Sequence, residues 1–244
     1  MTSHRIYIKK EIEVSQELIL EGEEAHHLLH VVRVKPLNQL ILFTPQAREF
    51  LAQVKEISKK DLILQVLKER QIFEKPYKMI LAQAIPKSQK MDWIVEKASE
   101  IGVDEIFPLF TERVVKKTIR IDRWQKIAIA ACQQCRRVNI PQVHSVQTWD
   151  EFILKTKEFD LALIPTLGRT DRQTMDGVVD QGNKFKNVVI AIGPEGDFSP
   201  SEVEKAIALG WIPIDLGPMT LRSETAAITS LAILDHELRK KLKV

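Results

Sequence analysis

Two short segments, Ile192-Gly-Pro-Glu-Gly-Asp-Phe-Ser199 and Leu216-Gly-Pro-Met-Thr-Leu-Arg-Ser-Glu-Thr-Ala226, decide how the C-terminal part of this sequence is interpreted. Each contains a Gly-Pro pair and follows an apolar run typical of a buried strand. The first also opens an expected helix, with Ser199 as N-cap, Pro200 at the first position and Glu202 three residues after the cap. Because ligands bind beyond the carboxyl ends of strands in open α/β sheets, both segments are candidate parts of a ligand site.

The residues around these segments alternate between strand-like and helical patterns. Strand-like runs cover 79–84, 105–110, 160–164, 187–192 and 212–216, and helical patterns cover 89–101, 120–137, 199–210 and 223–240. Such alternation predicts an α/β fold with a mostly parallel sheet and helices on both faces.

The first third of the chain consists mainly of short strand-like runs. Short runs at 39–43, 49–57 and 61–67 show partial period-two alternation, and one helix is expected at 23–32. The polar stretch 68–77 contains Pro76 and is typical of a linker, although it could also be one last strand plus a short connection. The sequence therefore predicts a small β-barrel domain over 1–72 and an α/β domain over 73–244.

Composition and charge limit the classes of protein that fit. The chain has 244 residues, 44% hydrophobic and 28% charged, with a formal net charge of +3, which is ordinary for a soluble globular protein and compatible with a nucleic-acid partner. The N-terminus lacks the apolar core of a signal peptide and no apolar run approaches a membrane span. We therefore expect a cytoplasmic protein with no membrane partner.

The two cysteines, Cys132 and Cys135, have the spacing of half a zinc site, but no second pair exists. Their segment also has the apolar stripe of a packed helix, so we expect no metal.

The glycines and prolines of the two segments allow two interpretations. Gly193, Gly196 and Gly217 could let the backbone approach a ligand closely, with Pro194 and Pro218 stiffening the loops. Alternatively, each Gly-Pro pair is an ordinary turn that connects a strand to a helix and has no binding role. Neither segment matches the dinucleotide fingerprint or the phosphate-loop pattern. No motif therefore indicates a Rossmann dinucleotide-binding protein or a nucleoside-triphosphate-binding protein.

Several motifs, in the same order along the chain, resemble the RsmE-type 16S ribosomal RNA uridine methyltransferases, which belong to the SPOUT class. The motifs are GPEGDFSPSE and LGPMTLRSETA, the stretch from Lys87 to Val103, Thr111-Glu-Arg113, Ala131 to Arg137, and HHLLHVVR at 26–33. The resemblance covers nearly the whole chain. One departure is visible: the family usually writes GPEGG, whereas this chain has Asp197 after Gly196. Asp tolerates a positive φ better than most residues, so we expect the loop to survive.

The resemblance implies a fold, a reaction and partners. It implies a C-terminal trefoil-knotted sheet, with the knot made from 163–168, 192–196 and 216–225, and an N-terminal PUA-like barrel. It implies a homodimer that uses S-adenosylmethionine to methylate N3 of a uridine in 16S ribosomal RNA, either naked or within the small ribosomal subunit. Two alternatives stay open: a SPOUT enzyme that modifies transfer RNA, and an RNA-binding relative without turnover.

The same resemblance assigns roles to individual residues. The methyl-donor pocket is expected to be lined by Leu163, Ile192, Gly193, Gly196, Leu216, Gly217 and Leu221. RNA contacts are expected from Arg5, His27, Arg33, Lys90, Arg113, Gln134 and Arg137. Leu163, Ile192 and Leu216 could instead be ordinary core at strand ends, but their adjacency to the two motifs favours the pocket. Each lone Lys or Arg could be a solvated charge.

The catalytic candidates are Arg222, Glu224 and Glu195. Uridine N3 carries a proton that must leave before methyl transfer, so a base or a stabilising positive charge is expected. Arg222 stays protonated and would hold the base or a phosphate. Either glutamate could accept the proton, although Glu224 also suits the first turn of a helix.

Overall fold

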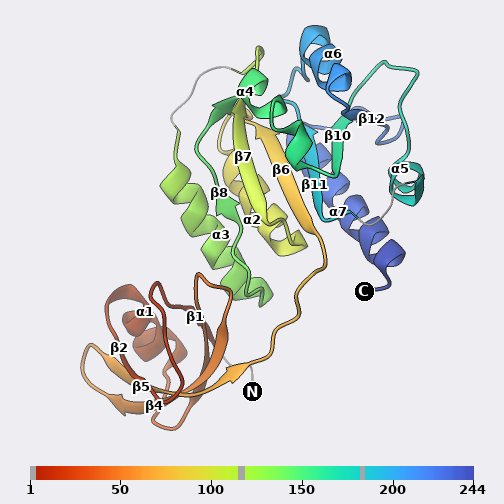
Figure 1. The fold of residues 1–244 in the computed structure, drawn as a ribbon. Coiled ribbons are helices and arrows are strands. Elements are labelled where there is room, and N and C mark those ends of the chain that lie inside the picture. Colours follow the sequence, from red (N-terminus) through yellow and green to blue (C-terminus); the bar gives the residue numbers. More distant parts are fainter. Residues whose placement is uncertain (1–3, 115–118, 182–184) are drawn as a thin grey trace. The chain divides into compact units, whose positions relative to one another are not determined.

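The computed structural model describes residues 4–114, 119–181 and 185–244 (Figure 1). The chain divides into two compact units. The smaller contains residues 1–74 and 132–140, and the larger contains residues 75–131 and 141–244.

The smaller unit is a curled five-stranded sheet with the strand order β1-β3-β4-β5-β2. Its strands are β1 (Arg5–Tyr7), β2 (Glu17–Leu20), β3 (Gln39–Phe43), β4 (Glu49–Ile57) and β5 (Leu62–Arg70). All pairs are antiparallel except β1 with β3, and register shifts in the β4–β5 pair mark the irregularities that help a sheet to curl. A short helix α1 (Gly22–His26) continues into the π-helix η1 (His27–Val32), where the sequence predicted one helix. The expected small N-terminal barrel is confirmed.

The larger unit contains a parallel sheet with the order β12-β10-β11-β6-β7-β8, and β9 also pairs with β7. The strands are β6 (Lys78–Ala84), β7 (Glu105–Phe110), β8 (Gln142–Val143), β9 (Gln147–Thr148), β10 (Leu161–Pro165), β11 (Asn187–Ile192) and β12 (Ile212–Ile214). Every described pairing in this sheet is parallel, so the predicted fold class is confirmed.

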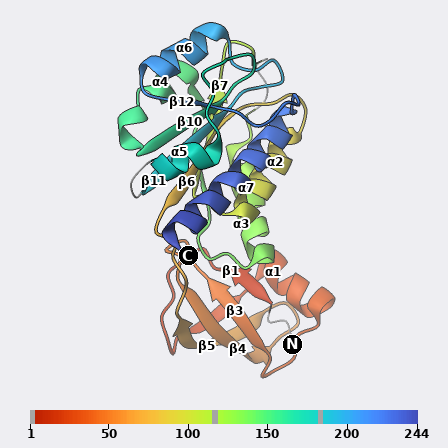
Figure 2. The ribbon, with the colours of Figure 1, turned by 90° about the vertical axis from the view of Figure 1, so that its right-hand side faces the viewer.

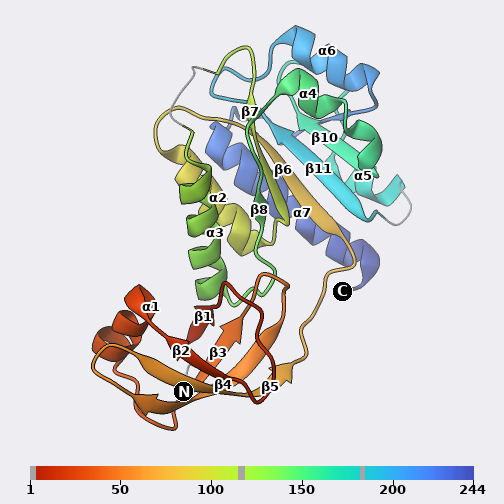
Figure 3. The ribbon, with the colours of Figure 1, turned by 60° about the vertical axis from the view of Figure 1, so that its left-hand side comes forward.

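Helices cover both faces of this sheet (Figures 2 and 3). They are α2 (Lys90–Ile101), α3 (Ile121–Cys135), α4 (Trp149–Ile153), η2 (Thr156–Glu158), α5 (Met175–Gln181), α6 (Pro200–Ala208) and α7 (Ser223–Leu242). Alternate strand residues enter two separate cores: Met79 and Leu81 pack in the core of α2, α5 and α7, whereas Ile80 and Ala82 pack in that of α4 and α6. The period of two in a strand produces this division. The shorter elements α4, α5, β8 and β9 were not predicted, because they are too short to show a hydrophobic period.

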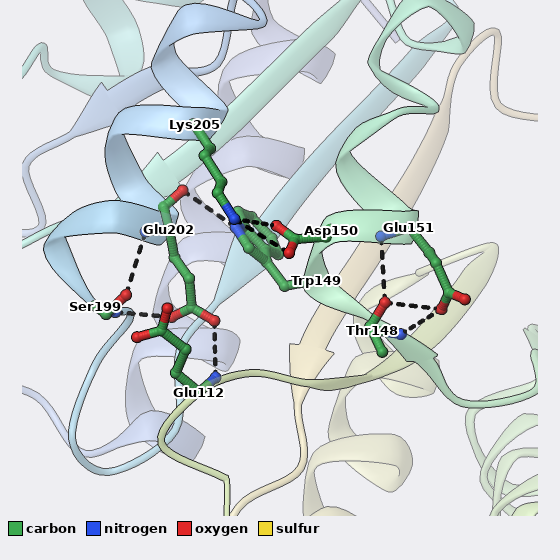
Figure 4. Close-up of polar contacts among 8 residues, drawn as sticks. All are labelled: Glu112, Thr148, Trp149, Asp150, Glu151, Ser199, Glu202 and Lys205. Atoms are coloured by element: carbon green, nitrogen blue, oxygen red, sulfur yellow. Dashed lines mark hydrogen bonds and ion pairs between the residues drawn. The ribbon is translucent and has the colours of Figure 1, made fainter.

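Two helices begin with a reciprocal capping box (Figure 4). In α6 the Glu202 N–H donates to Ser199 Oγ at 3.2 Å and the Ser199 N–H donates to Glu202 Oε2 at 2.7 Å, as the sequence predicted. Thr148 and Glu151 form the equivalent box at α4. Buried Glu202 also accepts from the Glu112 N–H at 2.8 Å, so the cap of α6 holds the loop that follows β7.

Within the described ranges, no helix is both long and apolar enough to cross a membrane.

Candidate functional site

A cavity opens at the carboxyl edge of the parallel sheet. β12, β10 and β11 are neighbours in this sheet, so the loops that follow them meet at one edge. Residues 165–167, 192–197 and most of 214–223 line the cavity, together with Arg172 and Ala226. The three segments that the resemblance assigns to a knot therefore lie together around one hollow.

Six of the seven residues predicted for the methyl donor lie in the lining: Ile192, Gly193, Gly196, Leu216, Gly217 and Leu221. The seventh, Leu163, is fully buried in β10 between Ile190 of β11 and Ile212 of β12, outside the lining. Leu163 packs the sheet beneath the cavity.

Gly193 occupies a position where no side chain fits. A Cβ there would lie 2.9 Å from both Asp197 Oδ1 and the Phe198 backbone nitrogen. Gly217 differs, because it adopts φ +102° and a Cβ there would meet no atom within 4 Å. The first glycine is required by close packing of the loop on itself and the second by backbone conformation.

A buried chain of hydrogen bonds fixes the first loop against helix α7. Gln83 Nε2 donates to Ser223 Oγ at 3.0 Å, and Ser223 Oγ donates to the Gly193 carbonyl at 2.6 Å. Both side chains are buried. Neither residue was predicted to have a role in the site, although Gln83 was detectable as the one polar residue within the apolar run 79–84.

Lys90 lies between both candidate bases. Its Nζ is 3.0 Å from Glu224 Oε2 and 3.5 Å from Glu195 Oε1, and Glu195 also accepts from the Lys87 N–H at 2.8 Å. Burial opposes ionisation of Glu224, but a backbone hydrogen bond and Lys90 outweigh it, so the pKa of Glu224 lies below its ordinary value. The hydrogen bond to Glu224 raises the pKa of Lys90. This group is therefore an ammonium held by two carboxylates, an arrangement that the sequence did not predict.

Arg222, the third catalytic candidate, is exposed at the N-cap of α7 and lies outside the cavity lining. Its backbone is extended, with φ −68° and ψ 153°. Its positive charge nevertheless contributes to the lowered pKa of Glu224.

Arg113 was predicted to contact RNA. Its guanidinium donates to the carbonyl of Gly196 and, at 3.4 Å, to that of Phe198. Its Cδ would be 3.3 Å from a Cβ on Gly196. In this structure Arg113 therefore holds the first loop from the side of β7.

The RNA candidates of the smaller unit divide by exposure. His27, Arg33 and Gln134 are exposed, and Arg137 is half-buried. The Arg5 side chain is only 8% exposed, pairs with Glu49 and donates to the Arg137 carbonyl at 3.2 Å. Arg5 thus ties the first strand to the segment after α3, where a nucleotide has little access to its guanidinium.

Both cysteines lie in the last turn of α3, as the apolar-stripe interpretation predicted. Cys132 is buried and Cys135 is half-buried, and they do not form a disulfide. Over the described parts of the chain, no group of three or more His, Cys, Asp or Glu side chains is placed to hold a metal ion.

The fold and this cavity define an α/β protein that has a small-ligand site at the carboxyl edge of its parallel sheet and also contains a small β-barrel. Comparison with known proteins narrows this class. The RNA methyltransferase domain family matches residues 73–235, and the RNA methyltransferase PUA domain family matches residues 20–67.

Relatives match along nearly their whole length. Ribosomal RNA small subunit methyltransferase E of Buchnera aphidicola subsp. Acyrthosiphon pisum is 35% identical, with 94% of this chain and 92% of the relative covered. The Bacillus subtilis protein of the same name is 27% identical, with 94% and 93% covered. The structure of ribosomal RNA small subunit methyltransferase E from Neisseria gonorrhoeae, bound to S-adenosyl methionine, superposes with a TM-score of 0.85 at 27% identity over 96% of this chain and 97% of that one. The chain belongs to this RNA methyltransferase family.

Proposed function

We propose that this chain transfers the methyl group of S-adenosylmethionine to N3 of a uridine in 16S ribosomal RNA. The observation that carries the proposal is the cavity, in which three loops after neighbouring parallel strands meet in a member of the RNA methyltransferase family. The Neisseria gonorrhoeae relative is named for small-subunit ribosomal RNA and was solved with S-adenosyl methionine.

The lining fits an adenosyl group. Ile192, Leu216 and Leu221 supply apolar surface, and Gly217 exposes its backbone where a side chain would otherwise stand. Such a site, mostly apolar with a few backbone groups, is the usual form of a cofactor pocket. The bound donor supplies an activated methyl group, and the chain's own residues orient the uridine and remove its proton.

Lys90 and the two glutamates that it contacts, Glu195 and Glu224, are suited to removing the proton from uridine N3. An ammonium near N3 would stabilise the uridine anion, and Glu224 or Glu195 would accept the proton once released from Lys90. Exposed Arg222, at the start of α7, would hold the base or a phosphate of the RNA.

We assign RNA recognition to domain 1–72 and methyl transfer to domain 73–244. Exposed His27 and Arg33 are the proposed RNA contacts of the first domain, and Gln134 and Arg137 are further proposed contacts in the second. Arg5 acts on RNA only through the strand that it holds. A ribosomal substrate would also place the reaction in the cytoplasm.

We further propose a homodimer. Leu167 and Met219, at the edge of the cavity, are 52% and 72% exposed, which is high for large apolar side chains on a functional loop. A second copy would cover them. Light scattering should therefore give twice the chain mass, and Met219→Asp should reduce it to one chain.

The activity test uses labelled S-adenosylmethionine with small ribosomal subunits, naked 16S ribosomal RNA and transfer RNA in separate reactions. Label should appear on uridine N3 of the ribosomal RNA, as located by nuclease digestion and mass spectrometry. Label on transfer RNA alone would reject the proposed substrate, and donor binding without transfer to any RNA would indicate a relative without turnover.

A further inference from the structure

Asp197 is a carboxylate in the lining of the cavity, at the position where the RsmE-type resemblance leads us to expect glycine. Its φ is +60°, in the left-handed region that favours glycine and that Asp tolerates better than most residues. The chain therefore keeps the backbone conformation of the loop and adds a negative charge to it.

The carboxylate is bound by backbone groups of two loops. Asp197 Oδ1 accepts from the Phe198 N–H at 2.8 Å, and the backbone of Leu167 also donates to this carboxylate. A Cβ on Gly193 would lie 2.9 Å from Oδ1, so the carboxylate rests directly against the Gly193 backbone. Leu167, Gly193 and Asp197 all line the cavity, which fixes the negative charge at its wall.

The other charged residues of the lining have partners of opposite charge. Arg172 pairs with Asp215 at 2.9 Å, and Glu195 lies 3.5 Å from Lys90. Among the residues that the structure describes, no cationic group lies within 4.0 Å of the Asp197 carboxylate, because nearby Arg113 binds the carbonyls of Gly196 and Phe198 instead. Burial raises the pKa of Asp197 despite the two backbone hydrogen bonds and the charge of Arg113. The ionised carboxylate is thus incompletely compensated, and a cation entering the cavity would stabilise it.

We propose that Asp197 makes this cavity prefer the positively charged methyl donor over its neutral demethylated product. The inference rests on the proposed function. S-adenosylmethionine carries a sulfonium cation, whereas S-adenosylhomocysteine carries an uncharged thioether at the same place. Both carry the same α-ammonium and carboxylate, so those groups cancel when the two ligands are compared. A preference of this kind favours exchange of spent product for fresh donor after each transfer.

The test measures dissociation constants of both ligands by calorimetry for the unaltered chain, Asp197→Asn and Asp197→Gly. Asn retains an acceptor oxygen for Phe198 and Leu167 and tolerates the left-handed backbone. Gly removes the side chain altogether and restores the family residue. Thermal denaturation of each variant shows whether the loop substitution leaves the fold intact.

In Asp197→Asn we expect affinity for S-adenosylmethionine to fall about five- to tenfold, the size of one attraction between half-buried charges, with affinity for S-adenosylhomocysteine unchanged within about twofold. Asp197→Gly should lose the same preference. Equal loss of both affinities in Asp197→Asn would overturn the inference, because the carboxylate would then act only as a loop tie or on the shared α-ammonium. If the unaltered chain bound neither nucleoside, the proposed function would itself fail, which is a distinguishable result.

Discussion

The loops 193–198 and 217–222 both begin with Gly-Pro and both line the cavity, but they are held very differently. Two side chains from distant parts of the chain bind the first loop: Ser223 donates to the Gly193 carbonyl and Arg113 donates to the Gly196 carbonyl. Glu202 caps the helix that follows this loop. In the second loop Pro218, Met219 and Thr220 are exposed.

This difference separates two tasks. A loop fixed from several sides pre-organises a binding site and lowers the entropic cost of ordering it. An exposed loop that ends in Arg222 is placed to meet a large partner such as RNA. We therefore expect substitution of a packed residue in the first loop to damage stability and donor binding together. Substitution of exposed Arg222 in the second loop should damage turnover with little effect on stability.

The broadest effect is expected for Gly193→Ala, which should damage both stability and donor binding. The new Cβ would overlap Asp197 Oδ1 and the Phe198 backbone nitrogen, and backbone atoms cannot move aside as a flexible side chain can. Calorimetry should show a loss of donor affinity of about tenfold or more, and chemical denaturation a loss of about 1–3 kcal/mol. Gly177→Ala is the matched control, because its nearest neighbour is the movable Thr174 hydroxyl at 3.0 Å. Unchanged donor binding in Gly193→Ala would contradict the tight fit of the loop.

Arg222→Ala should lower single-turnover methyl transfer by about 100-fold, the usual loss when one charge-stabilising group is removed. Its free energy of unfolding should stay within about 0.5 kcal/mol of the unaltered chain, because the side chain is exposed. Arg222→Lys keeps the charge but loses the planar fork, so partial recovery would separate charge from geometry. An equal loss of turnover and stability would return Arg222 to a structural role and remove the contrast between the loops.

Ser223→Ala should lower the free energy of unfolding by about 1–3 kcal/mol, because it leaves the buried Gln83 amide and Gly193 carbonyl without this partner. Ser230→Ala in the same helix is the control. The Ser230 hydroxyl is buried and has no hydrogen-bond partner among the described residues, so its removal should be neutral or slightly stabilising. If urea denaturation ranked the two variants equally, the hydrogen-bond chain would contribute little to the first loop.

The smallest effect is expected in the pH dependence of Lys90→Met. Because the folded pKa of Glu224 is lowered, the carboxylate stays ionised above that pKa and its favourable interaction is lost as the pH falls through it. Removing Lys90 raises that pKa, so the acid limb of kcat/KM should move to higher pH.

Lys97→Met provides the control for this pH shift, since Lys97 lies on the same helix and also pairs with two glutamates, Glu96 and Glu100, away from the cavity. An acid limb that stays in place in Lys90→Met would argue against Glu224 as the proton acceptor.

The sequence by itself determined the parallel sheet with helices on both faces, the N-terminal barrel and the start of α6. These follow from local signals: the hydrophobic period, the alternation of strand and helix, and the capping pair Ser199 and Glu202. It also located the two cavity loops, because each follows a strand and the carboxyl ends of parallel strands lie at one edge of the sheet.

Only the tertiary structure decided which side chains meet around those loops. Gln83 reaches Ser223, which is 140 residues away, and Lys90 reaches Glu224, which is 134 residues away. Both Arg113 and Arg5 were expected to contact RNA. In the structure Arg113 donates to the Gly196 carbonyl, and Arg5 donates to the Arg137 carbonyl and pairs with buried Glu49. Such contacts depend on the packing of distant elements and on the direction of each side chain, which no local period or spacing encodes.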